Sequence, residues 1–424
     1  MTAPIRRRTI LAAGAATAGL SLPGVAAFAG GDRSRSVRFT LDAEVLDGGE
    51  QVTSITLDTS RLGAIDPASL TTGTFTVHAK ATSPIPVVAP DLIFSEYDLD
   101  RAVTRARVNR RGDIVLDLDH AEGQVGGGTL GYIVSRSRNV QLDLVYTITQ
   151  NAPLSVRGRG PVTIERFVQG KLSSPEVDAF AYGVSRSEMK YRLYSPTGGR
   201  SRSAGRGKRP LIVWLHGGGE GGSLPDGYYD NETTLRANRG ALGFATPEAQ
   251  EIFSGAYVVA PQSTSYWIED GPRFAPLIKE IIEEVARKHP IDRDRIHVVG
   301  CSNGGYMTMK MTSVYRHLFA SSVPICGVVE SLVPGGPRLL TDAELTKIST
   351  PTWLVTSKDD ATVPPEPNTI HANDLIEDSL LTLYDNVTWN GHQFAGHWSW
   401  IYVARNDPRI RRTRIWQWMA RQRN

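Results

Sequence analysis

The chain has 424 residues, with 40% apolar and 21% charged side chains, which is typical of a folded protein of about two domains and excludes collagen-like, disordered and membrane-bundle classes. Its formal charge is +3, and the first 29 residues carry three arginines and no other charged side chain, so the rest of the chain is neutral. A neutral chain gives no electrostatic reason to expect nucleic acid as a partner.

Residues 1–29 have the pattern of a secretory signal peptide. Arg6–Arg8 precede an apolar run rich in Ala and Gly, which ends at the small-x-small sequence Ala27–Ala29. Adjacent arginines and weak hydrophobicity favour the twin-arginine route. The run contains Pro23 and falls short of the ~20 strongly apolar residues of a membrane span. We therefore expect a secreted, extracellular protein that makes no membrane contact after signal cleavage.

Residues 30–169 are predicted to form a β-sandwich. Apolar and polar residues alternate from Ser36 to Asp42, which is the period of a half-buried strand. Similar runs follow at residues 52–57, 74–79, 113–119 and 140–148. No helical periodicity is found before about residue 170. Several short strands separated by turn residues are typical of an immunoglobulin-like domain.

Residues 170–424 are predicted to form an α/β domain. Strands are expected at residues 189–194, 211–215, 256–260, 296–300, 322–325 and 352–356, and helices at 273–288, 306–315 and 410–421. Strands that alternate with helices predict a mainly parallel sheet with helices on both faces. The segment 197–209 is rich in Gly, Ser and Arg, and we predict a hairpin-type surface loop inside this domain.

A nucleophile motif lies between a predicted strand and a predicted helix. Residues Gly300–Gly304 read G-C-S-N-G and fit the G-x-S-x-G pattern. The preceding strand ends at Val299 and the following helix starts near Tyr306, which is the context that a nucleophile elbow requires. Glycines leave room for the chain to reverse at so tight a turn. We predict Ser302 as the nucleophile, against the alternative of an ordinary glycine-rich turn.

A second glycine-rich segment, His216–Gly219, follows the buried strand at residues 211–215. Backbone N–H groups of such a turn can hold the oxyanion of a tetrahedral intermediate. We predict that Gly218 or Gly219 supplies one donor and the N–H of Asn303 the other. The segment lacks the glycine spacing and the lysine of phosphate-binding loops, so a phosphate site is disfavoured.

Several neighbours of these motifs are candidates for secondary roles. His216 is expected to be a structural hydrogen-bonding residue, and Glu220 to lie at the rim of the substrate pocket or to be a solvated acid. Tyr266, Trp267 and Trp398 are candidates for lining an acyl or aromatic pocket, although we expect at least one of them to belong to the core.

The acid that orients a catalytic base is expected after the strand at residues 352–356, because the order along the chain in this fold is Ser, Asp or Glu, then His. The following residues read S-K-D-D-A-T-V-P. The D-x-x-V-P pattern selects Asp360, and the neighbouring Asp359 is expected to be solvated or salt-bridged.

Three histidines are candidates for the base. His371 begins a predicted surface helix and is discounted. His392 and His397 share a loop near the C-terminus, where the base of this fold is expected. We favour His397, which stands in a G-H-W-S-W sequence, and keep His392 as the alternative base.

The chain has two cysteines, Cys301 and Cys326. Both are expected near the ends of neighbouring strands, so they could form a disulfide in an exported protein or remain two buried thiols. Two cysteines do not make a disulfide scaffold.

The second domain resembles secreted esterases related to polyhydroxyalkanoate depolymerases and feruloyl esterases. The segments that carry the likeness are residues 216–219, 300–306, 360–364 and 396–400. In that family a G-H-x-S-W segment holds the catalytic histidine, which supports His397. The whole chain is similar to esterases that carry an N-terminal immunoglobulin-like domain.

The resemblance implies hydrolysis of small or medium carboxylic esters by Ser302, His397 and Asp360 through an acyl-enzyme, without a cofactor or a metal. The chain lacks a recognisable polymer-binding module, which argues against an insoluble polyester. A serine peptidase of the prolyl oligopeptidase type is the first alternative, but the ~40-residue repeats of its β-propeller are not found. A non-catalytic binding protein is the second. Assembly into a homo-oligomer is left open by the sequence.

Overall fold

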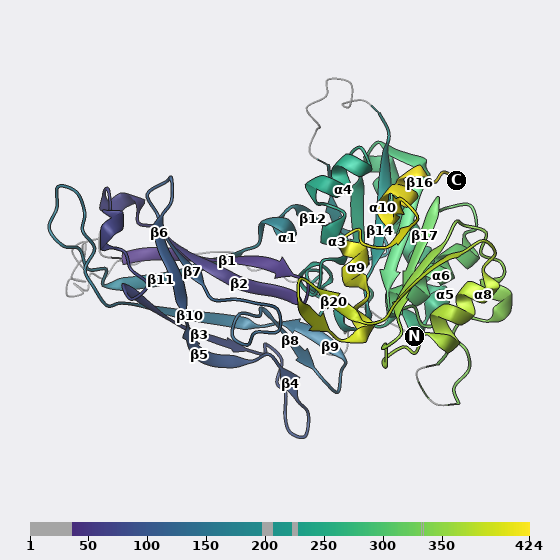
Figure 1. Cartoon of the computed structure of the whole chain (residues 1–424), viewed down its shortest axis with the longest axis horizontal. Helices are drawn as coiled ribbons and strands as arrows, with labels where there is room; N and C mark the ends of the chain where they lie inside the picture. Colours follow the sequence, from purple (N-terminus) through teal and green to yellow (C-terminus); the bar gives the residue numbers. More distant parts are fainter. Residues whose placement is uncertain (1–35, 197–206, 223–227, 332, 334) are drawn as a thin grey trace, which may run out of the picture.

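The computed structural model describes residues 36–196, 207–222, 228–331, 333 and 335–424. Two parts lie side by side, a strand-rich N-terminal part and a C-terminal part in which helices surround a sheet (Figure 1). The predicted signal peptide lies outside the described residues. Among the described helices, none has the length and apolar character needed to cross a membrane.

The N-terminal part contains two main sheets, with strand orders β11-β1-β2-β7-β6 and β10-β3-β5. In β1 alternate residues from Val37 to Val45 are buried, because successive side chains of a strand point to opposite faces. β3 alternates in the same way. Buried residues of both sheets belong to one hydrophobic cluster. The strands are β1 (Ser36–Leu46), β2 (Gly49–Leu57), β3 (Phe75–Thr82), β5 (Tyr97–Arg101), β6 (Val103–Val108), β7 (Ile114–Leu118), β10 (Asp143–Gln150) and β11 (Arg166–Ser173).

A third, smaller sheet has the order β4-β8-β9, from β4 (Ile93–Phe94), β8 (Leu130–Ile133) and β9 (Arg138–Gln141). It lies at the end of the N-terminal part that faces the C-terminal part (Figure 1).

Two predicted boundaries in the N-terminal part differ from the structure. The strand expected at residues 140–148 is two strands, β9 and β10, which separate at Leu142. The N-terminal sheet also continues past the predicted boundary at residue 169, because β11 pairs in parallel with β1 as far as Ser173. Apolar alternation does not show where a chain leaves one sheet for another.

The C-terminal part is built on an eight-stranded sheet of order β12-β13-β15-β14-β16-β17-β18-β19. β12 pairs antiparallel with β13 and β13 with β15, and the other neighbours pair in parallel. The strands are β12 (Phe180–Val184), β13 (Lys190–Tyr194), β14 (Arg209–Leu215), β15 (Tyr257–Pro261), β16 (Ile291–Cys301), β17 (Ser321–Ile325), β18 (Trp353–Ser357) and β19 (Leu380–Tyr384). This arrangement confirms the predicted mainly parallel sheet.

Both faces of this sheet are covered. Leu211, Val213 and Leu215 of β14 belong to one hydrophobic cluster together with the apolar face of α5. Ile212 and Trp214 belong to a second cluster on the other face. A strand buried on both faces needs a continuous apolar run, which explains the sequence of β14.

Ten α-helices are found in the described C-terminal region, most of them short. They are α1 (Pro175–Asp178), α2 (Thr233–Arg236), α3 (Gly240–Gly243), α4 (Pro247–Ile252), α5 (Gly271–Lys288), α6 (Asn303–Val314), α7 (Asp342–Leu345), α8 (His371–Leu375), α9 (Trp400–Ala404) and α10 (Ile415–Arg421). Two small hairpins accompany them: β20 (Val387–Trp389) with β21 (His392–Phe394), and β22 (Arg409–Ile410) with β23 (Thr413–Arg414).

Two further expectations for the C-terminal part are corrected. The loop at residues 197–209 does not join the two strands of a hairpin, because β15 lies between β13 and β14; residues 197–206 themselves lie outside the described chain. The helix expected at residues 410–421 starts only at Ile415, because the preceding residues form the β22–β23 hairpin.

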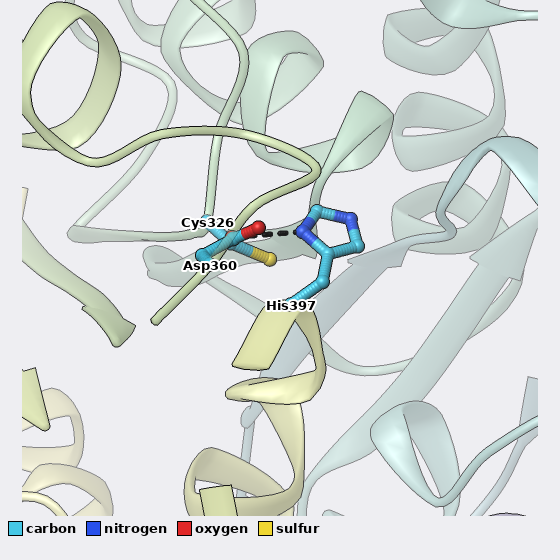
Figure 2. A group of neighbouring side chains, drawn as sticks. All are labelled: Cys326, Asp360 and His397. Atoms are coloured by element: carbon cyan, nitrogen blue, oxygen red, sulfur yellow. Dashed lines mark hydrogen bonds and ion pairs between the residues drawn. The ribbon is translucent and has the colours of Figure 1, made fainter. Parts of the chain in front are cut away.

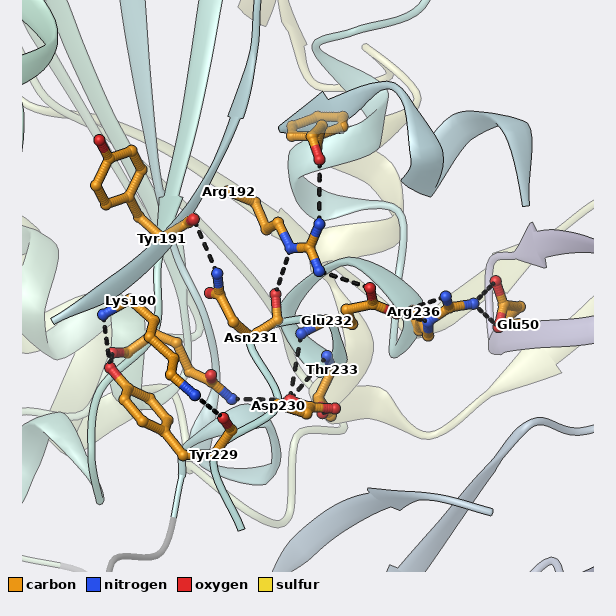
Figure 3. Close-up of polar contacts among 12 residues, drawn as sticks. Glu50, Lys190, Tyr191, Arg192, Tyr229, Asp230, Asn231, Glu232, Thr233 and Arg236 are labelled. Atoms are coloured by element: carbon orange, nitrogen blue, oxygen red, sulfur yellow. Dashed lines mark hydrogen bonds and ion pairs between the residues drawn. The ribbon is translucent and has the colours of Figure 1, made fainter. Parts of the chain in front are cut away.

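A buried ion pair joins the two parts. Arg236 of α2 donates from Nη1 to both carboxylate oxygens of Glu50 on β2, at 2.6 and 2.5 Å (Figure 3). The side chains are 6% and 0% exposed. Arg405 also pairs with Asp47 at 2.9 Å. These contacts hold the β1–β2 end of the N-terminal part against the α/β part.

Candidate active site

Ser302 occupies a strained turn between β16 and α6. Its backbone has φ 55° and ψ −116°, a region that a residue with a side chain enters only when the surrounding structure enforces it. A Cβ atom on Gly304 would lie 2.0 Å from the carbonyl oxygen of Leu215, so only glycine fits there. The tight turn leaves Ser302 half-buried at the carboxyl end of the central strand, as expected of a nucleophile elbow.

Asp360 and His397 form a hydrogen-bonded pair. His397 Nδ1 lies 2.8 Å from Asp360 Oδ2 (Figure 2). The other carboxylate oxygen of Asp360 accepts hydrogen bonds from the backbone N–H groups of Thr362 and Val363, at 3.0 and 2.8 Å. These two bonds fix the carboxylate so that Oδ2 faces the imidazole. Asp359 is exposed and accepts a hydrogen bond from Ser357.

The two other candidate histidines lie elsewhere. A Cβ atom on Gly123 of the N-terminal part would be 3.1 Å from the His392 ring, and that ring also packs edge-on against Phe394. His371 is paired with Asp342 at 2.9 Å on the surface of α8. The structure therefore brings His397, and neither of the other two, to Asp360.

Ser302 is linked to this pair through the end of β17 and makes no hydrogen bond to it among the described residues. Its backbone N–H donates to the carbonyl oxygen of Ile325 at 2.8 Å, and the next residue, Cys326, is in the group of side chains around His397. Within the described residues, no hydrogen bond joins Ser302 Oγ to His397. Such bonds are often long in free enzymes and shorten when substrate binds.

The segment His216–Glu220 is held from behind by buried side chains. His216 donates from Nδ1 to Gly217 O at 2.6 Å and accepts at Nε2 from the N–H of Ser263 at 3.0 Å. This pattern needs neutral imidazole, and burial lowers the pKa of His216 to about 4. His216 thus has a structural environment, as we expected.

Gly218 lies next to Asn303. A Cβ atom on Gly218 would be 3.7 Å from Asn303 Nδ2. Asn303 is the first residue of α6, so its N–H has no partner inside the helix. The structure therefore brings the residues Gly218 and Asn303 together, with Gly219 one residue further along.

Glu220 is buried, so the alternative of a solvated acid is wrong, while its place at a pocket rim stays a prediction. The residue is 7% exposed. Asn238 Nδ2 donates to its Oε1 over 3.5 Å, and Oε2 has no hydrogen-bond partner among the described residues. Burial raises the pKa of Glu220 to about 7. The glycine-rich loop turns the Glu220 side chain inward. The sequence pattern does not predict which way this side chain points.

Glu220→Gln is expected to change how stability depends on pH. In the wild type the pKa rises from 4.5 in the unfolded chain to about 7 in the folded protein. The free energy of unfolding therefore falls as pH rises through this range, by up to about 3 kcal/mol. Glutamine does not ionise, so the variant keeps the stability that the wild type loses. Urea unfolding at pH 4.5 and pH 8 measures the free energy of unfolding of the wild type and of Glu220→Gln.

The matched control is Glu377→Gln, which removes an exposed acid. Its stability difference from wild type should be the same at both pH values. Equal pH dependence of the wild type and Glu220→Gln would contradict the burial of an ionisable Glu220.

The predicted pocket aromatics have different positions. Trp267 is 0% exposed and donates from Nε1 to the carbonyl oxygen of His216 at 3.1 Å, so it supports the segment His216–Glu220 from the core and does not line a pocket. Tyr266 contacts Gly218. Trp398, next to His397, is partly exposed and stacks on Trp400.

The N-terminal part reaches this region, which the sequence did not predict. A Cβ atom on Gly219 would be 2.8 Å from Asn139 Nδ2 and 3.7 Å from the Tyr132 ring. Tyr266 donates from its hydroxyl to the carbonyl oxygen of Arg136. The β8–β9 hairpin thus packs on the glycine-rich segment His216–Glu220.

Cys326 is the site residue that sequence reasoning missed. It is buried at the end of β17, and its sulfur lies near the His397 ring (Figure 2). Burial opposes a charge on His397, whereas the hydrogen bond to the Asp360 carboxylate favours it and raises the pKa of His397. Cys301 and Cys326 are both free thiols. The sequence did hold one sign that Cys326 belongs to the site. Cys326 follows a predicted parallel strand, and the carboxyl ends of parallel strands meet at one edge of the sheet.

Comparison with known proteins identifies the fold. No protein-family model matches the chain. A solved structure titled "Crystal Structure of a Thermostable Esterase" aligns with a TM-score of 0.69 and 22% identity, over 91% of this chain and 99% of that chain. Together with the strand order, this likeness shows that the chain has the α/β-hydrolase fold, which confirms the fold predicted for the C-terminal domain.

Two curated relatives match parts of the sequence. Poly(3-hydroxyalkanoate) depolymerase C of Paucimonas lemoignei is 34% identical over 84 residues, which is 17% of this chain and 20% of that protein. The protein named "Putative esterase NocK" of Nocardia uniformis subsp. tsuyamanensis is 25% identical over 184 residues, 42% of this chain and 51% of that protein. The chain therefore spans a fifth and about half of the relatives' lengths.

Proposed function

We propose that this α/β-hydrolase-fold protein is a secreted serine esterase that hydrolyses small or medium carboxylic esters. The observations that carry the proposal are the Asp360–His397 pair, joined at 2.8 Å, and a serine held at φ 55° on the turn after β16. An orienting acid, a base and a nucleophile on a strained elbow are the three groups that acyl transfer needs.

In the proposed mechanism His397 Nε2 takes the proton of Ser302 Oγ as that oxygen attacks the ester carbonyl. Asp360 holds Nδ1–H and stabilises the imidazolium that forms. His397 then gives its proton to the departing alcohol, which leaves an acyl group on Ser302. A water molecule, deprotonated by His397, attacks this acyl-enzyme and releases the acid and the free serine.

The negative charge of each tetrahedral intermediate is proposed to lie between the N–H of Asn303 and the N–H of Gly218 or Gly219. The N-terminal end of α6 adds a favourable dipole there. His216 and Trp267 keep the glycine-rich loop in place through their buried hydrogen bonds, so the donors need no reorganisation during the reaction.

Substrate class and export are further parts of the proposal. The names of the two curated relatives, a depolymerase of a polyester and an esterase, support ester substrates. The basic and apolar pattern of residues 1–29 supports export by the twin-arginine route. The shared core of the two N-terminal sheets supports an immunoglobulin-like sandwich.

Hydrolysis of a short p-nitrophenyl ester by the purified protein tests the proposal. We expect turnover by the wild type and background rates for Ser302→Ala. Equal rates for the two proteins would overturn the assignment of Ser302. Faster cleavage of an aminoacyl p-nitroanilide than of the ester would favour a peptidase instead.

A further inference from the structure

We propose that Cys326, Asp360 and His397 form a binding site for one thiophilic divalent cation, such as Zn²⁺, and that the bound cation inhibits the enzyme. The inhibition rests on the proposed esterase function, whereas the binding does not. The site is built from the acid and base of the proposed triad and from a thiol that the proposed reaction does not use.

The geometry of the three side chains suits a zinc ion. One ligand atom from each residue lies within 4.8 Å of the other two, and Figure 2 shows the sulfur and the carboxylate on the same side of the imidazole ring. Zn–S distances of about 2.3 Å and Zn–N or Zn–O distances of about 2.1 Å place tetrahedral ligands about 3.5 Å apart. Small side-chain movements therefore bring all three atoms to the metal.

The donor set also favours zinc over the hard cations. A thiolate, an imidazole and a carboxylate are the ligands of zinc sites, whereas magnesium and calcium prefer oxygen alone. The backbone N–H groups of Thr362 and Val363 hold Asp360 Oδ1 and leave Oδ2 for the metal. Such outer hydrogen bonds orient the ligands of metal sites.

Cys326 is also fixed for this role. Its N–H donates to the carbonyl oxygen of Val355 at 2.8 Å, and its backbone has φ 39°. Cys326 and Asp360 are buried, while the His397 side chain is 12% exposed. A cation would therefore enter past the His397 ring, the most exposed of the three side chains.

Binding would block the base by fixing its tautomer. The metal bonds to His397 Nδ1, so the proton on that nitrogen moves to Nε2, and the thiol proton of Cys326 leaves to solvent. With Nε2 protonated, His397 cannot accept the proton of Ser302. The Nδ1 bond to the metal also replaces the hydrogen bond to Asp360.

Cys301 provides a matched control. It is equally buried and lies one residue before Ser302, but it is not in the group formed by Cys326, Asp360 and His397. A Cβ atom on Gly217 would be 3.6 Å from its sulfur, so Cys301 faces the segment His216–Glu220. A reaction of any buried thiol would affect both cysteines, whereas the proposed site needs only Cys326.

The test uses Co²⁺ as a spectroscopic probe and Zn²⁺ as the inhibitor, on the tag-free protein. We expect one Co²⁺ per chain with a thiolate-to-cobalt charge-transfer band in the wild type, in Ser302→Ala and in Cys301→Ala. Cys326→Ala should lack the band and bind Zn²⁺ at least about 10-fold more weakly in equilibrium dialysis. An absent band in the wild type, or an unchanged one in Cys326→Ala, would overturn the site.

Ester hydrolysis supplies the second readout. Zn²⁺ should inhibit the wild type and Cys301→Ala reversibly, with recovery in EDTA, while Mg²⁺ has no effect. Each variant is compared with its own metal-free rate, and Cys326→Ala should resist Zn²⁺. Inhibition that is equal in Cys326→Ala would contradict the proposal. A cobalt band in a protein without esterase activity would uphold the site and reject the proposed function.

Discussion

Asp360→Asn is expected to lower kcat for a p-nitrophenyl ester by about 10⁴-fold, the loss measured when the acid of a serine protease triad is amidated. The amide cannot stabilise the imidazolium, and its NH₂ group would favour the tautomer in which His397 Nδ1 accepts a hydrogen bond. His397→Ala should lose at least as much, because it removes the base itself. Steady-state kinetics at pH 8 measure both variants.

Two neighbouring residues serve as controls. Asp359→Asn and His392→Ala should keep kcat close to the wild type, because the structure pairs neither residue with the other members of the site. A large loss in either control, together with a small one in Asp360→Asn or His397→Ala, would reassign the acid or the base.

Arg236→Met is expected to lower the free energy of unfolding by about 3–5 kcal/mol, because it leaves the carboxylate of Glu50 buried without its partner. Both oxygens of Glu50 accept from Arg236, and among the described side chains only Thr129 would still donate to its carboxylate, at 2.7 Å. Urea unfolding followed by tryptophan fluorescence measures the loss.

The second substitution Glu50→Met in the same chain should recover most of this stability, since a buried ion pair can often be replaced by apolar side chains at little cost. Lys279→Met is the surface control. It breaks a pair with Glu283 in which both side chains are 39% exposed, and such pairs contribute about 0–1 kcal/mol. Equal losses in Arg236→Met and Lys279→Met would show that the pair does not hold the two parts together.

Local patterns were sufficient to predict the central elements of the fold. Three patterns each reflect what one short segment needs in order to fold. They are the apolar run of β14, the helical period of α5 and the glycines around Ser302. A tight turn, a strand buried on both faces and an amphipathic helix each have a recognisable local sequence pattern.

The sequence also pointed to Asp360 and His397, although it could not fix their contact. The order of the triad along the chain gave the region, the D-x-x-V-P pattern selected Asp360, and the G-H-W-S-W segment favoured His397 without excluding His392. The choice between His392 and His397 needed the structure, because both lie in one loop and only the backbone path decides which ring meets Asp360.

Contacts between distant segments were not predictable. Three such contacts join residues from separate elements: Cys326 with His397, Asn139 with Gly219, and Glu50 with Arg236. Neither periodicity nor composition records which loop ends lie side by side. The direction of Glu220 was missed for the same reason, since a glycine-rich loop permits several paths and the packing selects one.

Covalent labelling of Ser302 by an organophosphorus fluoridate tests the central claim most directly. The reagent reacts with a serine that is activated by a base and faces an oxyanion site. We expect one adduct per wild-type chain by intact mass, mapped to the peptide that contains Ser302, no adduct in Ser302→Ala and strongly slowed labelling in His397→Ala. An adduct on a different residue, or equal labelling of the wild type and Ser302→Ala, would contradict the account.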